Sequence, residues 1–390
     1  MALISQSAFR ANLCQCGQKE IRIGSKQSSW AHTLAFNNPS SLTCSRLKPK
    51  HIQPYKIKKI RSPIRMTLVD DKPRLSQKTS PPAGVLAYDL VQGALVRWSM
   101  VDRSVPEPPT AVLLHGILGG RKNWGSFARR LAREFPTWQF LLVDLRCHGD
   151  SASIPKPAPH TVASAAQDVL QLVGQLRLTP RVLVGHSFGG KGWNCAVALS
   201  MADQAAKPLA RPVRVWVLDA TPGKVHAGGD GEDHPAELIS LLCQMPKQVA
   251  SKHYVIDTLV QNGFSREIAQ WITTSLRPVN SFGTAITGFQ WVFELQGIAE
   301  MYRSYENTKL WQVVENVPEG VHVDFLRAER SLHRWAHEDI QRIHAAEELA
   351  ASEGAGVQMH VLEDSGHWVH ADNPDGLFRV LASSFGYFNQ

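Results

Sequence analysis

Residues 181–190 of the chain read Arg-Val-Leu-Val-Gly-His-Ser-Phe-Gly-Gly, and this stretch decides the fold. The apolar, β-branched run that ends at Gly185 predicts a buried strand, and the small residues from Gly189 onward predict a helix. The Gly-x-Ser-x-Gly pattern between them is typical of a sharp strand–turn–helix connection that exposes a serine hydroxyl. Ser187 is therefore the predicted nucleophile. The same turn aims the N–H of Phe188 and the positive end of the helix at a developing oxyanion.

A phosphate-binding loop is the competing interpretation of the same residues. From Gly185 to Lys191 the chain also reads Gly-x-x-x-x-Gly-Lys, the opening of a nucleotide-binding motif. That motif requires Ser or Thr at the next position to ligate magnesium, and this chain has Gly192. The sequence therefore does not support nucleotide binding.

Composition describes a globular protein with an unusual amino-terminal segment. The 390 residues, 43% hydrophobic and 19% charged, suffice for one large or two ordinary domains, and no apolar run reaches membrane-spanning length. The net charge of +8 is uneven, because residues 1–69 hold twelve Lys or Arg against one acid, Glu20. The remainder has 30 basic and 33 acidic residues, so binding of nucleic acid by the body of the protein is not expected.

The first segment has the composition of an organelle transit peptide. Residues 1–66 are rich in Ser, Arg, Lys and Gln, nearly free of acid, and lack the compact apolar core of a secretory signal. We expect them to be disordered and to direct the protein to the chloroplast stroma, with the mitochondrial matrix as the alternative. A basic tail that stays on the protein is the other interpretation. Residues 67–83 read as a linker.

Cysteine usage points to a reducing compartment. Cys14, Cys16 and Cys44 fall in the amino-terminal segment, which leaves three cysteines in the body and no Cys-x-x-Cys pair there. Neither a disulfide scaffold nor a structural zinc site is expected from that pattern. The sequence implies neither a metal ion nor an organic cofactor.

The body alternates predicted strands and helices. A hairpin is predicted from the runs 85–91 and 94–100, which meet across Gln92 and Gly93. Short, continuously apolar strands separated by helices are typical of a parallel sheet covered on both faces. The predicted strands cover 111–114, 140–143, 181–184, 213–218, 321–326 and 357–361, and a closing helix runs from Pro374 to about Phe385.

Residues 224–316 interrupt this alternation. They predict helices around 235–244, 252–262, 265–275 and 286–305, with no clear strand, so we expect a helical cap over the active edge of the sheet. As a group its apolar side chains suggest an apolar lining, although each alone is expected in the cap's own core. They are Trp271, Phe282, Phe289, Trp291, Phe293 and Met301.

Polar residues follow several strands at the same edge. His115, Asp144, Ser187 and Asp219 each come directly after a predicted strand, and ligands bind where parallel strands end. Acyl transfer requires a nucleophile, a base and an acid that orients the base. His367 is the best base, because it follows the last strand and leaves room for one final helix.

Four motifs in this order resemble the alpha/beta-hydrolase fold family, in particular the small bacterial acyl esterases and their mitochondrial hydrolase-domain relatives. The resemblance spans residues 84–388 and implies a mostly parallel, eight-stranded-type sheet. It also implies an oxyanion hole formed by the N–H groups of Ile117 and Phe188. The motifs are His115-Gly116, Asp144-Leu-Arg-Cys-His-Gly-Asp-Ser151, Gly185-His-Ser-Phe-Gly-Gly-Lys191 and Gly366-His-Trp-Val-His-Ala-Asp372.

The acid departs from the commoner family pattern. Many relatives place Asp shortly after the strand that follows the cap, where this chain has Ser331. The resembled esterase subgroup uses the Asp that closes the strand before the cap, which corresponds to Asp219. Glu329 is the substitute, in which case Asp219 would cap a turn before Pro222.

The resemblance implies a serine hydrolase that cleaves an ester or thioester of a hydrophobic small molecule or lipid. Ser187 would attack, His367 would take and return the proton, and Asp219 would orient His367. Two alternatives stay open. His367 and Asp372 have the His-x-x-x-x-Asp spacing of some acyltransferases, and the same fold serves as a small-molecule receptor with little turnover in some plant-hormone systems.

Overall fold

The computed structural model describes residues 84–97, 107–186, 193–205, 212–223, 234–281, 285–353 and 356–386. All of them belong to one compact unit, Leu68–Gln390. The predicted transit segment and linker lie outside the described residues, as do Ser187 and Phe188.

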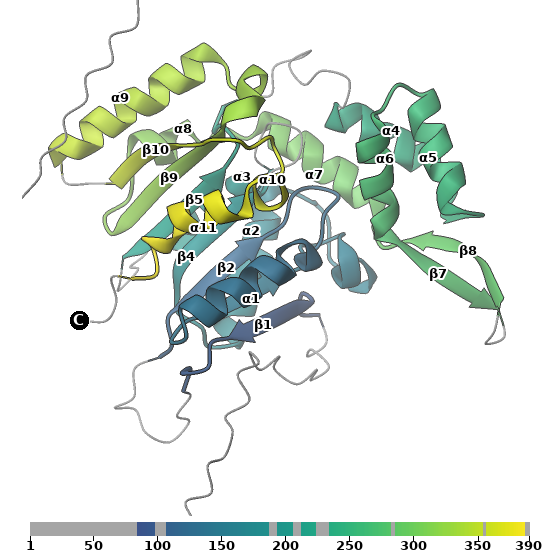
Figure 1. The fold of residues 1–390 in the computed structure, drawn as a ribbon, viewed down its shortest axis with the longest axis horizontal. Helices are drawn as coiled ribbons and strands as arrows, with labels where there is room; N and C mark the ends of the chain where they lie inside the picture. Colours follow the sequence, from purple (N-terminus) through teal and green to yellow (C-terminus); the bar gives the residue numbers. More distant parts are fainter. Residues whose placement is uncertain are drawn as a thin grey trace, which may run out of the picture. The chain divides into compact units, whose positions relative to one another are not determined.

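Seven strands form the main sheet in the order β1-β3-β2-β4-β5-β9-β10 (Figure 1). Only β1 runs antiparallel to its neighbour, and every other neighbouring pair is parallel. The predicted α/β architecture is confirmed, with seven strands among the described residues. The strands are β1 (Tyr88–Gln92), β2 (Thr110–Leu114), β3 (Gln139–Val143), β4 (Pro180–His186), β5 (Val213–Leu218), β9 (Val321–Ala328) and β10 (Gly356–Leu362).

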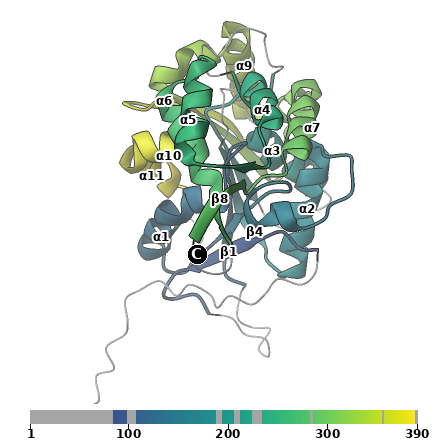
Figure 2. The same cartoon turned by 90° about the vertical axis from the view of Figure 1, so that its right-hand side faces the viewer.

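Helices cover both faces of this sheet (Figure 2). Alternate residues of β2 enter two separate cores, because successive side chains of a strand point to opposite faces. Val112 and Leu114 join the core of α2, α3 and α9, whereas Ala111 and Leu113 join that of α1 and α11. These helices are α1 (Gly125–Glu134), α2 (Val162–Gln175), α3 (Trp193–Ala205), α9 (His337–Glu353) and α11 (Pro374–Ala382).

The predicted amino-terminal hairpin is wrong for the residues that the structure describes. β1 pairs with β3, with Tyr88 opposite Val143, and residues 94–97 form no strand. The amides of Gly93 and Leu95 donate instead to the carbonyls of Trp138 and Pro136, just before β3. β1 therefore pairs with the edge of the buried strand β3 and not with the run 94–100, which the sequence predicted as its partner. Residues 98–100 lie outside the described part.

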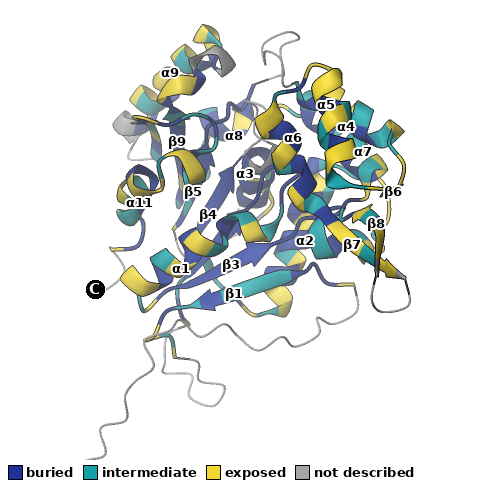
Figure 3. Cartoon of the chain, turned by 45° about the vertical axis from the view of Figure 1, so that its right-hand side comes forward, coloured by how far each residue is buried: buried dark blue, intermediate teal, exposed yellow. Residues whose placement is uncertain are grey.

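The segment between β5 and β9 is not purely helical, which corrects the predicted helical cap. Its described residues form five α-helices, one short 3-10 helix and a three-stranded antiparallel sheet in the order β6-β8-β7 (Figures 1 and 3). The helices are α4 (Pro235–Gln244), α5 (Lys252–Gln261), α6 (Arg266–Ile272), α7 (Leu295–Asn307) and α8 (Trp311–Glu315). The strands are β6 (Gln248–Val249), β7 (Leu276–Ser281) and β8 (Ala285–Trp291).

The predicted helix over 286–305 fails in its first part, which is β8. Phe289, Trp291 and Phe293 recur every second residue, which is the period of a strand rather than of a helix. Figure 3 shows this hairpin largely exposed at its far end, while the central strands of the main sheet are buried. Within the described residues, no helix has the length and apolar character needed to cross a membrane.

Candidate active site

The carboxyl ends of four parallel strands deliver the predicted site residues. His115 follows β2, His186 ends β4, Asp219 follows β5 and His367 follows β10. The structure brings Asp219, His186 and His367 together, although 148 residues separate Asp219 from His367 in the chain. The predicted nucleophile Ser187 lies outside the described residues.

Asp219 and His367 form a short, buried pair. Oδ2 of Asp219 lies 2.6 Å from Nδ1 of His367, and Asp219 is fully buried. Asp219 adopts a left-handed backbone conformation, with φ of 52°, which turns the chain as it leaves β5. A carboxylate that accepts from Nδ1 fixes the tautomer in which Nε2 is the basic nitrogen. The pair therefore has the geometry of a base and its orienting acid.

The other oxygen of Asp219 is held by three donors. Oδ1 accepts hydrogen bonds from the amide of Ala328 at 3.0 Å, the hydroxyl of Ser331 at 2.6 Å and the indole of Trp335 at 3.0 Å. Burial alone would raise the pKa of this carboxyl. The hydrogen bond and charge of His367, with the donors Ser331 and Ala328, outweigh it and leave the pKa below its usual value. Asp219 is therefore ionised at neutral pH.

Glu329, the alternative acid, has a different partner. Its Oε2 accepts the amide of Asp364 at 2.9 Å, and its side chain is exposed. Ser331 occupies the position where the sequence led us to look for an acid, and it hydrogen-bonds Asp219 instead. One feature of the sequence indicated this role, namely a serine at the position expected to hold the acid.

His186 has a hydrogen-bonding role in this site. Its Nε2 lies 2.8 Å from the main-chain oxygen of His367, so it donates a hydrogen bond to the loop that carries the predicted base. Burial lowers its pKa well below the usual value, and the neighbouring His367 and His370 add to this effect. His186 is therefore a neutral donor that fixes the His367 loop.

Two further histidines hold the loop that carries the predicted oxyanion donor Ile117. Nδ1 of His115 donates to the carbonyl of Gly116 at 2.8 Å. Nε2 of His148 accepts the amide of Leu118 at 3.1 Å, and Leu118 has a positive φ of 58°. Ile117 therefore lies between two anchored residues.

The ring of His148 is itself fixed at both nitrogens, because Nδ1 donates to the carbonyl of Arg146 at 2.8 Å. Burial lowers the pKa of His115 and reduces that of His148 to about 3, so both rings are neutral. A neutral ring can accept at one nitrogen while it donates at the other, which is what both contacts require. The sequence had singled out His148 only as part of a motif.

Asp144 has a structural role at this edge. Its carboxylate accepts the amides of Arg121 at 2.7 Å and Asp150 at 2.9 Å, and it forms an ion pair with the Arg121 side chain. Arg121 also pairs with Asp89 and Asp150. Asp144 therefore connects the loop after β2 to the loop after β3 through hydrogen bonds and an ion pair.

The inserted segment contacts the site through two aromatic side chains. Trp271 of α6 lies against Trp368, with ring centroids 4.7 Å apart, and Phe293 lies 5.7 Å from the ring of His148. A cavity of about 460 Å³ separates residues 119–123 from residues 271–278. Of the six predicted lining residues, Trp291, Phe293 and Met301 are buried in the interior core, Trp271 and Phe289 pack against that core, and Phe282 lies outside the described residues.

Comparison with known proteins places this geometry in a family. Residues 111–380 match the alpha/beta hydrolase family. The sn-1-specific diacylglycerol lipase ABHD11 of Xenopus tropicalis is 28% identical over 279 residues, which are 70% of this chain and 77% of that protein. Esterase YbfF of Escherichia coli is 24% identical over 69% of this chain and 90% of its own length.

A solved structure described as a marine microorganism esterase shares the fold. Its TM-score is 0.54 at 19% identity, and the alignment covers 77% of this chain and 99% of that one. At this identity the likeness shows the fold alone.

Proposed function

Because the chain belongs to the alpha/beta hydrolase family, we propose that it cleaves carboxylic esters or thioesters through an acyl-enzyme formed on Ser187. The observation that carries the proposal is the buried hydrogen bond between Asp219 and His367. The relatives named as esterases and as a lipase support the same reaction class.

In the proposed reaction, Nε2 of His367 takes the proton from the Ser187 hydroxyl as its oxygen attacks the carbonyl carbon. The carbonyl oxygen becomes negative and is stabilised by the N–H groups of Ile117 and Phe188. His367 then gives its proton to the leaving alcohol or thiol. Water, deprotonated by the same imidazole, releases the acid and restores Ser187. Asp219 stays ionised throughout.

The position of His186 supports the choice of nucleophile. It directly precedes Ser187 in the sequence, and its side chain donates to the main chain of His367. Consecutive Cα atoms are about 3.8 Å apart, so the predicted nucleophile follows immediately after a residue that contacts the predicted base.

We propose an apolar acyl or alcohol portion for the substrate, as in a lipid ester. Half-buried Trp271 offers aromatic surface beside Trp368, and Phe293, itself buried, packs against the ring of His148. The diacylglycerol lipase activity named for the Xenopus relative belongs to the same substrate class. Esters of increasing acyl length test this, because an apolar pocket binds each added methylene more tightly.

The test of mechanism is covalent labelling with a fluorophosphonate probe, which reacts with activated serines. Wild-type protein should be labelled, Ser187→Ala should not, and the exposed control Ser153→Ala should be labelled as wild type. Equal labelling of Ser187→Ala would contradict the proposal.

Product and binding measurements distinguish hydrolysis from the two alternatives, which are acyl transfer and a small-molecule receptor. Release of free acid in water alone, without an added alcohol, supports hydrolysis over acyl transfer. A receptor would bind its ligand tightly after Ser187→Ala and would turn over little ester before it. Rapid turnover that depends on Ser187 therefore contradicts the receptor interpretation.

We also propose that residues 1–66 direct the protein to plastids, on the basis of their basic, serine-rich and acid-poor composition. A fusion of these residues to a fluorescent protein, imaged in leaf cells with plastid and mitochondrial markers, tests this. Mitochondrial or cytosolic fluorescence would contradict it.

A further inference from the structure

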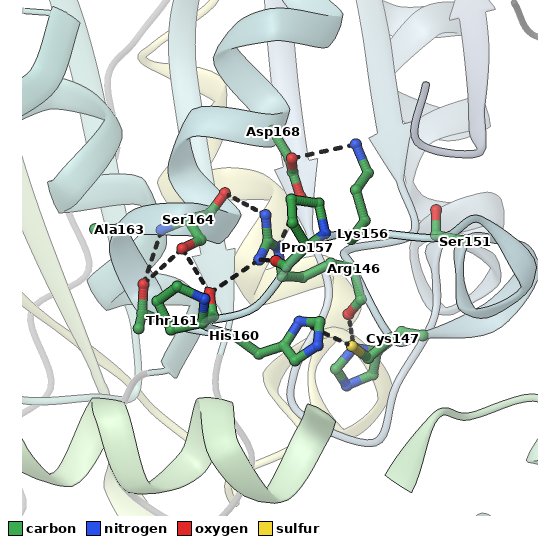
Figure 4. A network of polar contacts seen from close by, with 12 residues as sticks. Arg146, Cys147, Ser151, Lys156, Pro157, His160, Thr161, Ala163, Ser164 and Asp168 are labelled. Atoms are coloured by element: carbon green, nitrogen blue, oxygen red, sulfur yellow. Dashed lines mark hydrogen bonds and ion pairs between the residues drawn. The ribbon is translucent and has the colours of Figure 1, made fainter. Parts of the chain in front are cut away.

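A thiol, an imidazole and a carboxylate meet where the loop after β3 contacts the start of α7. Sγ of Cys147, a nitrogen of His160 and a carboxylate oxygen of Glu294 all lie within 4.8 Å of one another. Sγ of Cys147 and Nδ1 of His160 are 3.7 Å apart and face each other in Figure 4. None of the three contributes to the proposed reaction.

The main chain holds these residues in place. The amide of Glu294 donates to the carbonyl of Cys147 at 2.9 Å, which joins the two segments directly. Oε2 of Glu294 accepts the amide of Gly297 at 2.6 Å, which fixes the carboxylate over the first turn of α7. Cys147 has a φ of 65°, a conformation that residues with a Cβ rarely adopt. The donors are therefore positioned before any ligand arrives.

The three donor side chains pack closely against Gly297. A methyl group added to Gly297 would lie 2.5 Å from Sγ of Cys147, closer still to Oε2 of Glu294, and 3.2 Å from the ring of His160. Gly297 therefore lets the three donors approach one another, because any larger residue at this position would overlap two of them.

The separation of the thiol and the imidazole fits one shared ion. In a tetrahedral zinc site, a sulfur and a nitrogen ligand are roughly 3.6 Å apart. The observed separation between Cys147 and His160 is 3.7 Å. Thiolate, imidazole and carboxylate together form the mixed donor set that suits a borderline ion such as Zn²⁺. We propose that Cys147, His160 and Glu294 bind one zinc ion, with water as the fourth ligand.

The site would connect the inserted segment to the sheet. Cys147 and His160 come from the loops that follow β3, whereas Glu294 lies between β8 and α7. Cys147 directly precedes His148, whose ring accepts the amide of Leu118 in the predicted oxyanion loop. The ion would therefore fix the inserted segment next to that loop without touching reacting atoms. The sequence did not suggest this site, because it offers no paired cysteines.

Cobalt binding to the full-length, metal-free protein is the test, since a bound thiolate gives Co²⁺ an intense ligand-to-metal charge-transfer band. Wild-type protein should show this band, and zinc should abolish it by competition. Cys147→Ser should lose the band. The matched control Cys243→Ser should keep it, because that half-buried thiol lies near the carbonyl of Leu295, outside the cluster.

A second variant, His160→Ala, tests the site independently if Cys147→Ser does not fold. His160 is only half-buried, so His160→Ala should fold, and its zinc affinity should fall by about 100-fold or more. Zinc should raise the melting temperature of wild-type protein and of Cys243→Ser but not that of His160→Ala. A cobalt band that survives both Cys147→Ser and His160→Ala would overturn the proposal, as would the absence of a band in wild-type protein. Both results leave the Ser187 labelling test unaffected.

Discussion

Asp219 follows β5, one of two adjacent strands whose ends lie near His367; the other is β9. β5 and β9 are adjacent parallel strands, and Leu218 lies opposite Leu326. Neighbouring strands are about 4.8 Å apart, so residues just after either strand lie close together. Asp219 comes from the first strand, and Ser331, which hydrogen-bonds it, comes from just after the second.

Substitution of the two carboxylates distinguishes the acid. We expect Asp219→Asn to lower kcat by about 10³–10⁴-fold, because the amide no longer stabilises the tautomer and charge of His367. Glu329→Gln should change kcat by less than about threefold, because that side chain is exposed and accepts the amide of Asp364 rather than His367. Steady-state hydrolysis of a chromogenic ester measures both. Loss of activity only in Glu329→Gln would show that the assignment is wrong.

Ser331 is expected to act through Asp219. Ser331→Ala removes one hydrogen bond to a buried carboxylate and should lower kcat about 10-fold. Loss of this donor leaves more negative charge on the oxygens of Asp219 to stabilise the imidazole of His367 when it carries the proton, so the acidic limb of the kcat profile should move to higher pH. Ser331→Thr, which keeps the hydroxyl, should restore both. An unchanged pH profile in Ser331→Ala would contradict a positioning role.

At the scale of elements, the inserted segment departs most from its sequence prediction. Its helices α4, α5 and α6 follow the predicted ranges, because their apolar residues recur with a helical period. β7 and β8 were missed, since each is stabilised by hydrogen bonds to the other rather than within itself. α6 then places Trp271 against Trp368, next to the predicted base.

Trp271 provides a test of the proposed apolar substrate site. We expect Trp271→Ala to raise KM for long-chain esters about 10-fold, because aromatic surface is lost, and to leave kcat/KM for acetyl esters within about threefold. Tyr254→Ala on α5, where the side chain is exposed, is the matched control and should behave as wild type. The same loss for acetyl and long-chain esters would argue against substrate contact.

At the scale of the whole molecule, buried neutral histidines make stability depend on pH. Burial lowers the pKa of His115 and His186, that of His148 to about 3 and that of His370 to about 4. In the unfolded chain a histidine has a pKa of about 6.5. Between these values the unfolded chain binds protons that the folded protein does not, so stability is highest above pH 6.5 and decreases as the pH falls.

Urea unfolding measures this dependence. Between pH 7.5 and pH 5, each of these histidines should lower the free energy of unfolding by about 2 kcal/mol. His370→Phe should reduce the loss, because it removes one titrating ring whose Nδ1 is buried without a hydrogen-bond partner in the described part of the chain. Equal losses in the variant and the wild type would show that His370 is not buried in its neutral form.

The sequence by itself determined the parallel part of the main sheet, the succession of its strands and helices along the chain, and the predicted identity of the serine and histidine. These features depend on local patterns, namely apolar runs, the Gly-x-Ser-x-Gly turn and a histidine after the last strand. Each is contained within about ten residues. The role of Ser187 stays a prediction, since that residue lies outside the described structure.

Only the tertiary structure decided which carboxylate meets His367, which histidines hold the neighbouring loops, and where Cys147, His160 and Glu294 meet. The partners in these contacts come from separate strands and loops, and Asp219 and Glu329 both follow adjacent strands near the same edge. Spacing along the chain cannot distinguish them. Backbone direction at the strand ends does, because it aims one carboxylate at the imidazole and leaves the other exposed.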